Sequence, residues 1–126
     1  MIQGGISTNL DALLRLTLLG PDGGDYQIDS VIDTGFSGYL TLPRAVVSKM
    51  NFPWIGRAEA LLADGSVATF DIHRGIVSWD GEIRVVEVEA VDTKSLVGMG
   101  LLLGYAVRMD VMVGGEVRMS RIGNEA

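Results

Sequence analysis

Short turn sequences built on glycine divide this chain into apolar segments and largely decide what it can fold into. The 126 residues include 17 glycines, and 48% of the residues are hydrophobic. Asp-Gly or Gly-Gly between apolar segments is typical of a β-hairpin. Turns of this kind lie at residues 20–25, 64–66, 80–81 and 114–115. The sequence therefore predicts a single all-β domain over residues 1–126, a small closed β-barrel or folded sheet.

The elements expected between these turns are mostly strands. In the first strand Leu14, Leu16 and Leu18 alternate with other residues, so they share one face. Consecutive Val85 and Val86 interrupt a similar alternation and predict a bulge or a change of face. We expect strands at residues 11–19, 26–32, 39–42, 57–63, 67–73, 75–79, 82–91, 109–113 and 116–120. We expect a helical stretch at residues 43–50, opened by a proline, and a short C-terminal helix at residues 99–105.

Charge and composition exclude several classes of partner. The net charge of −6 and the pI near 4.6 argue against binding to nucleic acid or to an anionic membrane. The N-terminal residues lack the pattern of a signal peptide, and the longest uncharged stretch, residues 95–107, is too short to span a membrane. The chain has no cysteine, which excludes a disulfide framework and a zinc–thiolate site. We therefore expect a cytoplasmic protein without a metal or another cofactor.

Two further chemistries find little support in the sequence. A Ser-His-Asp triad would need the one histidine, His73, and no nucleophile-elbow sequence accompanies it. The glycines of residues 98–104 differ from a dinucleotide-binding loop in their spacing, and no βαβ unit follows them. Carboxylates remain as the groups to consider.

One carboxylate has a distinctive setting, because Val31 and Ile32 run directly into Asp33, Thr34 and Gly35. Two β-branched residues favour a buried strand, and glycine allows a tight turn directly after it. The simplest interpretation is a strand followed by a turn capped by aspartate. The alternative is half of a catalytic pair, in which two carboxylates lie so close that they share one proton. The chain contains one Asp-Thr-Gly sequence, so the second acid would come from a second copy across a two-fold axis.

Three features in order resemble the retropepsin-like aspartic proteases, the single-domain group that includes retroviral proteases and small prokaryotic relatives. The first is the apolar pair with Asp-Thr-Gly and a following Ser37. The second is a glycine-tipped hairpin at Ala63, Asp64, Gly65 and Ser66, where that family has its flap. The third is Leu96-Val97-Gly98 before a short helix. The match covers roughly residues 10 to 107, and residues 31–43 look most like the prokaryotic members.

The resemblance implies a fold, an activity and a set of roles. The fold would be that of one half of an acid protease, and the activity would be endopeptidase cleavage by a homodimer. Asp33 from each chain would hold the lytic water, Thr34 would cross-link the two loops, and Gly35 would offer its carbonyl to an extended peptide or protein substrate. The flap residues 63–66 would close over that substrate. The remaining implied roles are pocket lining by Val31 and Leu40 and a structural "psi" arrangement formed by Leu96, Val97 and Gly98.

The sequence also departs from the retroviral pattern. Retroviral enzymes usually pair an acid two residues after the glycine with an arginine after the second glycine of the psi arrangement. This chain has Ser37 and Met99 at those positions, so the dimer must be held differently. We expect residues 1–7 and 109–120 to build the interface, as an intersubunit sheet. Two alternatives remain: a non-catalytic dimeric peptide-binding or assembly domain with the same fold, and an unrelated β-barrel that carries the motif by chance.

Overall fold

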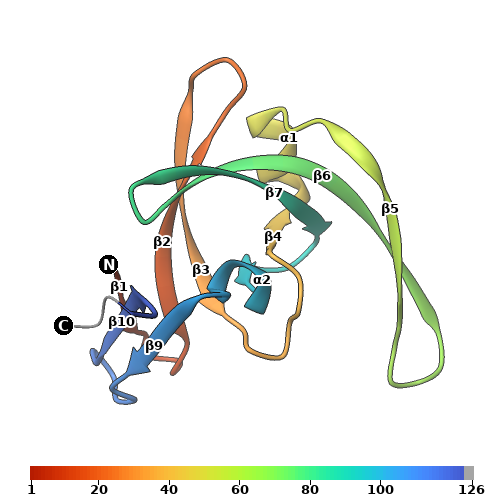
Figure 1. The fold of residues 1–126 in the computed structure, drawn as a ribbon. Helices are drawn as coiled ribbons and strands as arrows, with labels where there is room; N and C mark the ends of the chain where they lie inside the picture. The colour runs from red at the N-terminus through yellow and green to blue at the C-terminus, as the bar shows by residue number, and fades with distance from the viewer. Residues whose placement is uncertain (124–126) are drawn as a thin grey trace.

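The computed structural model describes residues 1–123 and contains a ten-stranded sheet with two short helices. The strands are β1 (Ile2–Ile6), β2 (Ala12–Leu19), β3 (Asp25–Ile32), β4 (Leu40–Pro43), β5 (Trp54–Leu61), β6 (Val67–Trp79), β7 (Glu82–Val91), β8 (Leu96–Val97), β9 (Tyr105–Met109) and β10 (Glu116–Arg121). The helices are α1 (Arg44–Met50) and α2 (Met99–Leu102). Figure 1 shows their arrangement.

Six strands close into a ring, in the order β6, β7, β4, β8, β3 and β2. The ring closes because β2 pairs with both β3 and β6, the latter through Thr17 with Ser78 and Leu18 with Val77. Leu14, Leu16 and Leu18 share the inner face of β2, as their alternation predicts, and are at most 2% exposed. The closed, all-β architecture expected from the sequence is confirmed.

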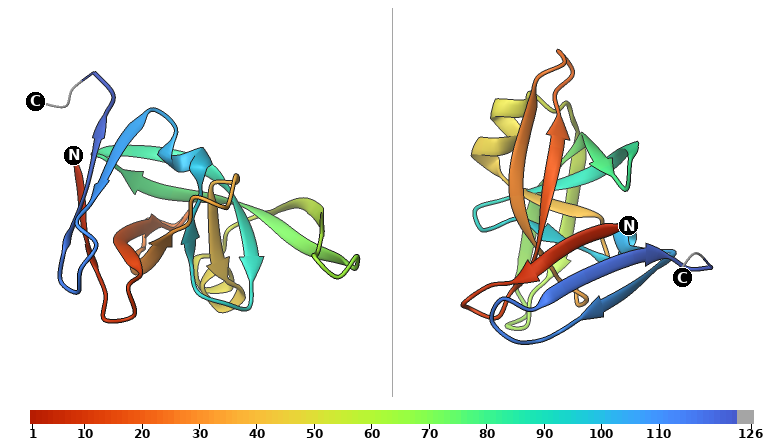
Figure 2. Two further views of the ribbon diagram at one scale, coloured as in Figure 1. Left: turned by 90° about the horizontal axis from the view of Figure 1, so that it is seen from below. Right: turned by 90° about the vertical axis from the view of Figure 1, so that its left-hand side faces the viewer.

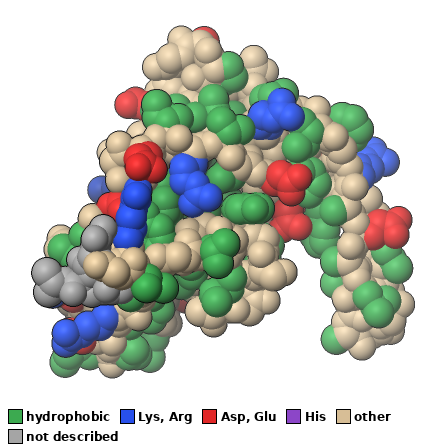
Figure 3. Space-filling model, in the orientation of Figure 1, with side chains coloured by type: hydrophobic (Ala, Val, Ile, Leu, Met, Phe, Trp, Pro, Cys, Tyr) green, Lys and Arg blue, Asp and Glu red, His purple; other side chains and the backbone are tan. Residues whose placement is uncertain are grey.

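The strand β6 continues beyond the ring, and with β5 it forms a hairpin that stands away from the body. Figures 1 and 2 show this β5–β6 hairpin as a separate arm, and Figure 3 shows a deep notch between the arm and the rest of the protein. Residues 61–67 at its tip are all exposed. The exposed tip has few apolar contacts to hold it, which allows the arm to move relative to the ring.

The N-terminal strand and the last two strands form a small sheet in the order β1, β10, β9. Ile2 pairs with Met119 and Gly4 with Val117, while β10 pairs with β9 along its other side. The two segments expected to build an intersubunit sheet therefore pair with each other inside one protomer. This terminal sheet packs onto the ring through Val117 and Met119, which are both 0% exposed.

Several element boundaries differ from the predictions. Residues 67–79 form one continuous strand instead of two, because β6 bends around the ring while it pairs with β7 without interruption. The bulge or change of face predicted at Val85 and Val86 is wrong, since the register there is regular. Ile83 and Val85 lie on the outer face and are 71% and 60% exposed. The last helix ends at Leu102, and Tyr105 begins β9, so the final hairpin starts earlier than the predicted residues 109–113.

Asp80, at the β6–β7 turn, ties the terminal sheet to the ring. Its carboxylate accepts hydrogen bonds from the Met1 ammonium (2.7 Å), from the Tyr105 hydroxyl (3.0 Å) and from Arg121 Nε (3.3 Å). The hydrogen bond from the Met1 ammonium, together with those from Tyr105 and Arg121, holds the pKa of Asp80 below its ordinary value. One side chain thus contacts β9, β10 and the residue that precedes β1.

We expect Asp80→Asn to loosen the terminal sheet, because an amide forms no ion pair with Arg121. A depressed pKa means that the stabilisation is present above the pKa of an unfolded aspartate and is lost as the pH falls through the lower pKa of the folded protein. The variant should therefore melt a few degrees below the wild type at neutral pH, and the two should converge in acid. Circular dichroism melts across this pH range measure the difference.

Asp29→Asn is the control, because Asp29 forms one exposed ion pair with Arg15 and such pairs contribute little. A melting-temperature difference between Asp80→Asn and the wild type that stays constant into acid would contradict the role given to Asp80.

Candidate active site

Asp33 lies directly after β3, at the point where the strand leaves the ring. Its backbone N–H donates to the carbonyl oxygen of Val97 (2.9 Å), which continues the parallel pairing of β3 with β8. Its carbonyl oxygen accepts the N–H of Phe36 (3.2 Å) and closes a turn. The position of the aspartate is therefore fixed on both sides by backbone hydrogen bonds.

The two-residue strand β8 lies between β3 and β4. Leu96 pairs with Val31 on one side and with Thr41 on the other, and Val97 pairs with Ile32 and Leu40. The Thr41 hydroxyl also accepts the N–H of Leu96 (2.9 Å). On one side of the ring, a segment from late in the chain thus supports the strand that carries Asp33. This is where the structure places the predicted psi residues Leu96, Val97 and Gly98.

Gly98 allows the loop after Asp33 to pack against β8. Its N–H donates to the carbonyl oxygen of Tyr39 (3.0 Å). The N–H of Met99 donates to the carbonyl oxygen of Phe36 (2.8 Å). A Cβ atom at position 98 would overlap the carbonyl oxygen of Gly38 and the ring of Phe36. Only glycine fits here, because the backbones of residues 36–39 and 98–100 are in direct contact.

The carboxylate of Asp33 is held within its own loop and has no cationic partner. Oδ1 accepts the N–H of Gly35 (2.9 Å). Among residues 1–123, no lysine, arginine or histidine forms an ion pair with Asp33. Asp33 is partly exposed, and Thr34 and Gly35 are exposed. The three residues predicted to be catalytic therefore form one accessible loop with a rigid backbone.

The predicted flap residues lie at the tip of the β5–β6 hairpin. Ala63, Asp64, Gly65 and Ser66 are all exposed. Asp64 Oδ1 accepts the backbone N–H (2.9 Å) and the hydroxyl (2.6 Å) of Ser66, which closes the turn. The hydroxyl hydrogen bond, followed by the backbone one, lowers the pKa of Asp64. The acid at the tip thus serves the turn itself.

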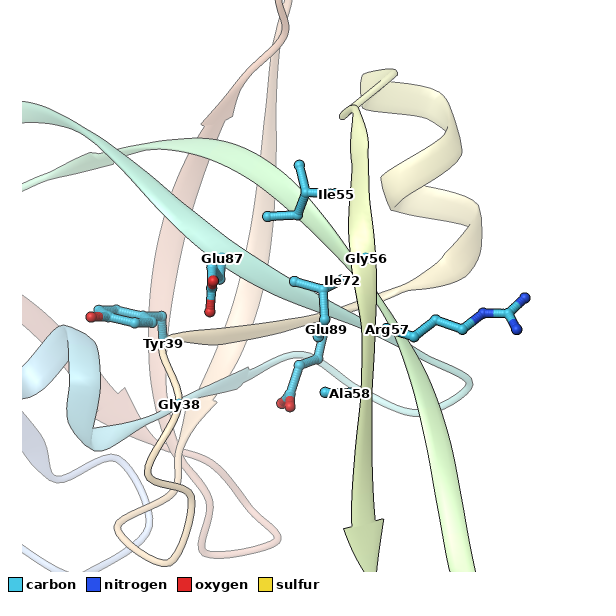
Figure 4. A pocket seen from close by; sticks show the side chains of 9 residues that line it. All are labelled: Gly38, Tyr39, Ile55, Gly56, Arg57, Ala58, Ile72, Glu87 and Glu89. Atoms are coloured by element: carbon cyan, nitrogen blue, oxygen red, sulfur yellow. The ribbon is translucent and has the colours of Figure 1, made fainter.

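A cavity of about 320 Å³ separates the arm from the loop that follows Asp33. Figure 4 shows Glu87 and Glu89 of β7 extending into it, while Arg57 points away. The residues that line it come from the loop, the hairpin and β7: Gly38, Tyr39, Ile55, Gly56, Arg57, Ala58, Ile72, Glu87 and Glu89. The cavity therefore combines aromatic and aliphatic walls with two carboxylates, and it adjoins the Asp33 loop without including Asp33.

The two carboxylates in the cavity lack cationic partners. Within the described residues neither Glu87 nor Glu89 forms an ion pair or a side-chain hydrogen bond. Arg57 binds Asp71 instead (3.3 Å). Burial raises the pKa of Glu89, and the like charge of Glu87 adds to this effect. The cavity wall therefore carries two acidic side chains that no described cation pairs with.

The two predicted pocket residues lie elsewhere. Leu40 is 1% exposed and belongs to the hydrophobic core, so its side chain is not accessible to a substrate in this protomer. The preceding Tyr39, which is 39% exposed, faces the cavity instead. Val31 is partly buried between Leu13 and Leu96 of the neighbouring strands. The cavity acids Glu87 and Glu89 could have been found from the sequence. They alternate with Val86 and Val88, so they occupy the opposite face of β7.

The structure also shows the two positions that depart from the retroviral pattern. Ser37 and Met99 are both exposed, and Met99 is 48% exposed although its N–H bonds to Phe36.

In residues 1–123 no group of three or more His, Asp or Glu side chains is placed to bind a metal ion. No helix in this part of the chain is long and apolar enough to cross a membrane.

A six-stranded ring with an aspartate loop held by an inserted strand and faced by a hairpin arm defines the retropepsin-like fold. The structure is similar to that of a retropepsin-like aspartic protease from Rickettsia conorii, with a TM-score of 0.58. The two share 17% sequence identity over 94% of this chain and 90% of the other. No family model and no curated protein matches the sequence. The fold predicted from the three sequence features is therefore confirmed.

We expect Gly98→Ala to destabilise the protein by at least about 2 kcal/mol, because the added methyl group has no space against the Gly38 carbonyl. Chemical denaturation measures the loss. Gly5→Ala is the matched control, since a Cβ there would meet the carbonyl oxygen of Gly115 at an ordinary 3.6 Å. Equal stability of the two variants would show that the packing of β8 against the loop is not tight.

We expect Glu89→Gln to stabilise the protein at neutral pH by less than about 1 kcal/mol, because it removes a partly buried charge beside Glu87. Because the pKa of Glu89 is raised in the folded protein, ionisation of Glu89 lowers the free energy of unfolding as the pH rises through that pKa. Below the pKa of an unfolded glutamate this loss of stability is absent. The gain should therefore vanish in acid, and Glu87→Gln should give a smaller gain. Denaturation at several pH values tests this, and a loss of stability at neutral pH would contradict it.

Proposed function

We propose that this protein is a homodimeric aspartic endopeptidase whose active site combines Asp33 from two protomers. The observation that carries the proposal is the accessible Asp33-Thr34-Gly35 loop, held rigidly by β8 and free of any cation among the described residues. Asp33 also caps its own turn by accepting the N–H of Gly35, but its carboxylate is partly exposed and forms no ion pair with a described residue. The similar solved structure supports a protease, because it is described as a retropepsin-like aspartic protease.

The proposed chemistry follows from two carboxyl groups that share one proton. The ionised carboxylate accepts a proton from a water molecule held between the two groups, while the protonated one donates to the carbonyl oxygen of the peptide bond. The resulting oxygen nucleophile attacks the carbonyl carbon. Proton transfer to the amide nitrogen then releases the two products. A pair that shares one proton loses it as the pH rises, so cleavage should be fastest below neutral pH.

The substrate in this proposal is an extended polypeptide. Thr34 would link the two loops, Gly35 would bind the peptide main chain, and residues 63–66 would close over it and exclude water. The notch in Figure 3 and the cavity beside Tyr39 provide space for alternate side chains. Such binding uses main-chain hydrogen bonds for affinity and cavities for specificity.

The alternative is a dimeric peptide-binding or assembly domain that does not cleave. Ser37 and Met99 cannot form the charged pair of the retroviral enzymes, so the active-site loops of a dimer would lack the constraint that this pair provides. This departure is compatible with a dimer that binds peptides without cleaving them. A carboxylate pair has no evident use in such a domain, since two acids brought together repel each other.

Asp33→Asn is expected to reduce peptide cleavage by about a thousandfold or more, because an amide cannot accept the proton of the water. An unbiased peptide library, followed by mass spectrometry at acid and neutral pH, measures the cleavage. Asp29→Asn, on the strand that leads into Asp33, is the matched control and should retain full activity. Cleavage by Asp33→Asn at the wild-type rate would reject the proposal, and a dimer that cleaves at no pH would favour the binding domain.

A further inference from the structure

The ten-stranded sheet has two edges, β5 and β9, and they differ in how they are protected. The β5 edge is interrupted by a register shift between Trp54 and Gly56 and carries Arg57 and Glu59. The β9 edge pairs regularly with β10 over its whole length, contains no proline and carries one charge, Arg108. Regular edges without such protection pair readily with another strand. Figure 2 shows β9 on the outside of the terminal sheet.

The direction of the free hydrogen-bonding groups on β9 follows from its pairing with β10. The N–H of Asp110 donates to Glu116 O, and the N–H of Ile122 donates to Gly104 O, both at 2.9 Å. Bonded and non-bonded pairs alternate in an antiparallel ladder, so the even-numbered residues of β9 bond to β10. The N–H and C=O groups of Tyr105, Val107 and Met109 therefore point away from the sheet.

The side chains on the inner face of β9 are only partly covered. Val107 is 36% exposed, whereas its cross-strand partner Met119 is 0% exposed. Tyr105 and Met109 are partly buried and pack against the core. A further strand outside β9 would cover this apolar edge and extend the core that already lies beneath β10.

We propose that this strand is β9 of a second copy of the chain, paired antiparallel with Val107 on the two-fold axis. In this register Val107 faces Val107, and Tyr105 of one protomer faces Met109 of the other. Every outward N–H then meets an outward C=O. Arg108 lies opposite Ala106, so no like charges face each other. The edge of β9 is thus complementary to itself, which commits it to a second copy rather than to an unrelated peptide.

This interface rests on the proposed function in one respect, because an Asp33 pair needs a second copy of the chain. The edge belongs to the same region as the Asp33 loop, since β9 follows Gly98 through the single turn of α2, and both lie in the lower part of Figure 1. The sheet formed would run β1, β10, β9 and then β9, β10, β1 of the partner. Residues 1–7 and 116–121 would thus support the interface while β9 makes it.

A single engineered cysteine tests the register, because the chain has no cysteine of its own. In the proposed pair the two Val107 Cα atoms lie about 5.5 Å apart, within the range of a disulfide. The two Ala106 Cα atoms lie about 8 Å apart, outside that range. Val107→Cys should therefore form a covalent dimer under mild oxidation and Ala106→Cys should not. Equal cross-linking of both variants, or of neither, would overturn the proposal.

A proline provides a second test that leaves the protomer intact. The Val107 N–H does not bond to β10, so Val107→Pro should fold, since edge strands accept proline at outward positions. Two hydrogen bonds across the axis would be lost, and the dissociation constant of the dimer should rise at least about tenfold. Sedimentation measures the mass, with Val107→Ala as the control that keeps the N–H. An unchanged mass for Val107→Pro, or a wild type that is monomeric throughout, would overturn the proposal.

The interface and the function fail in different ways. Cross-linking and mass do not depend on cleavage, so an inactive protein that cross-links at position 107 keeps the interface and loses the proposed function. An active dimer that is unchanged by Val107→Pro keeps the function and loses the interface.

Discussion

The rest of the structure depends on the insertion of β8 between β3 and β4. Two residues, Leu96 and Val97, supply hydrogen bonds to strands on both sides, and Gly98 then lets two backbones touch. This contact closes one side of the ring and fixes the N–H of Asp33 in the same step. The fold and the candidate site therefore share one set of interactions, and the position of Asp33 cannot change without opening the ring.

The sequence predicted the parts of this arrangement that local chemistry decides. Alternating leucines predicted β2 and its inner face, and the apolar pairs before Asp33 and Gly98 marked the two segments that meet. Boundaries were less accurate where tertiary contacts override local pattern. β6 continues through residues 67–79 because pairing with β7 supports it. The break in alternation at Val85 arises because apolar residues lie on the outer face of β7, not because the strand bulges. Nothing local indicated that residues 1–7 would pair with β10.

The cavity shows a second limit of predicting the site from the sequence. Its walls come from four separate stretches of the chain, at residues 38–39, 55–58, 72 and 87–89. The resemblance to a family placed Leu40 where the structure places Tyr39. A shift of one residue along a strand reverses the face, so a pocket residue cannot be assigned from a strand end whose register is unknown. The acids Glu87 and Glu89 were visible in the alternation of β7, but only the arm of β5 and β6 gives them a cavity to face.

The insertion of β8 also sets an order of events during synthesis of the chain. Its residues follow Val31 and Ile32 by about half the length of the 126-residue chain. Contacts this distant form late, because the loop between them must close first. The Asp33 loop therefore lacks its support until residues 96–98 have also left the ribosome. A growing chain would be unable to assemble this site, however early Asp33 itself is made.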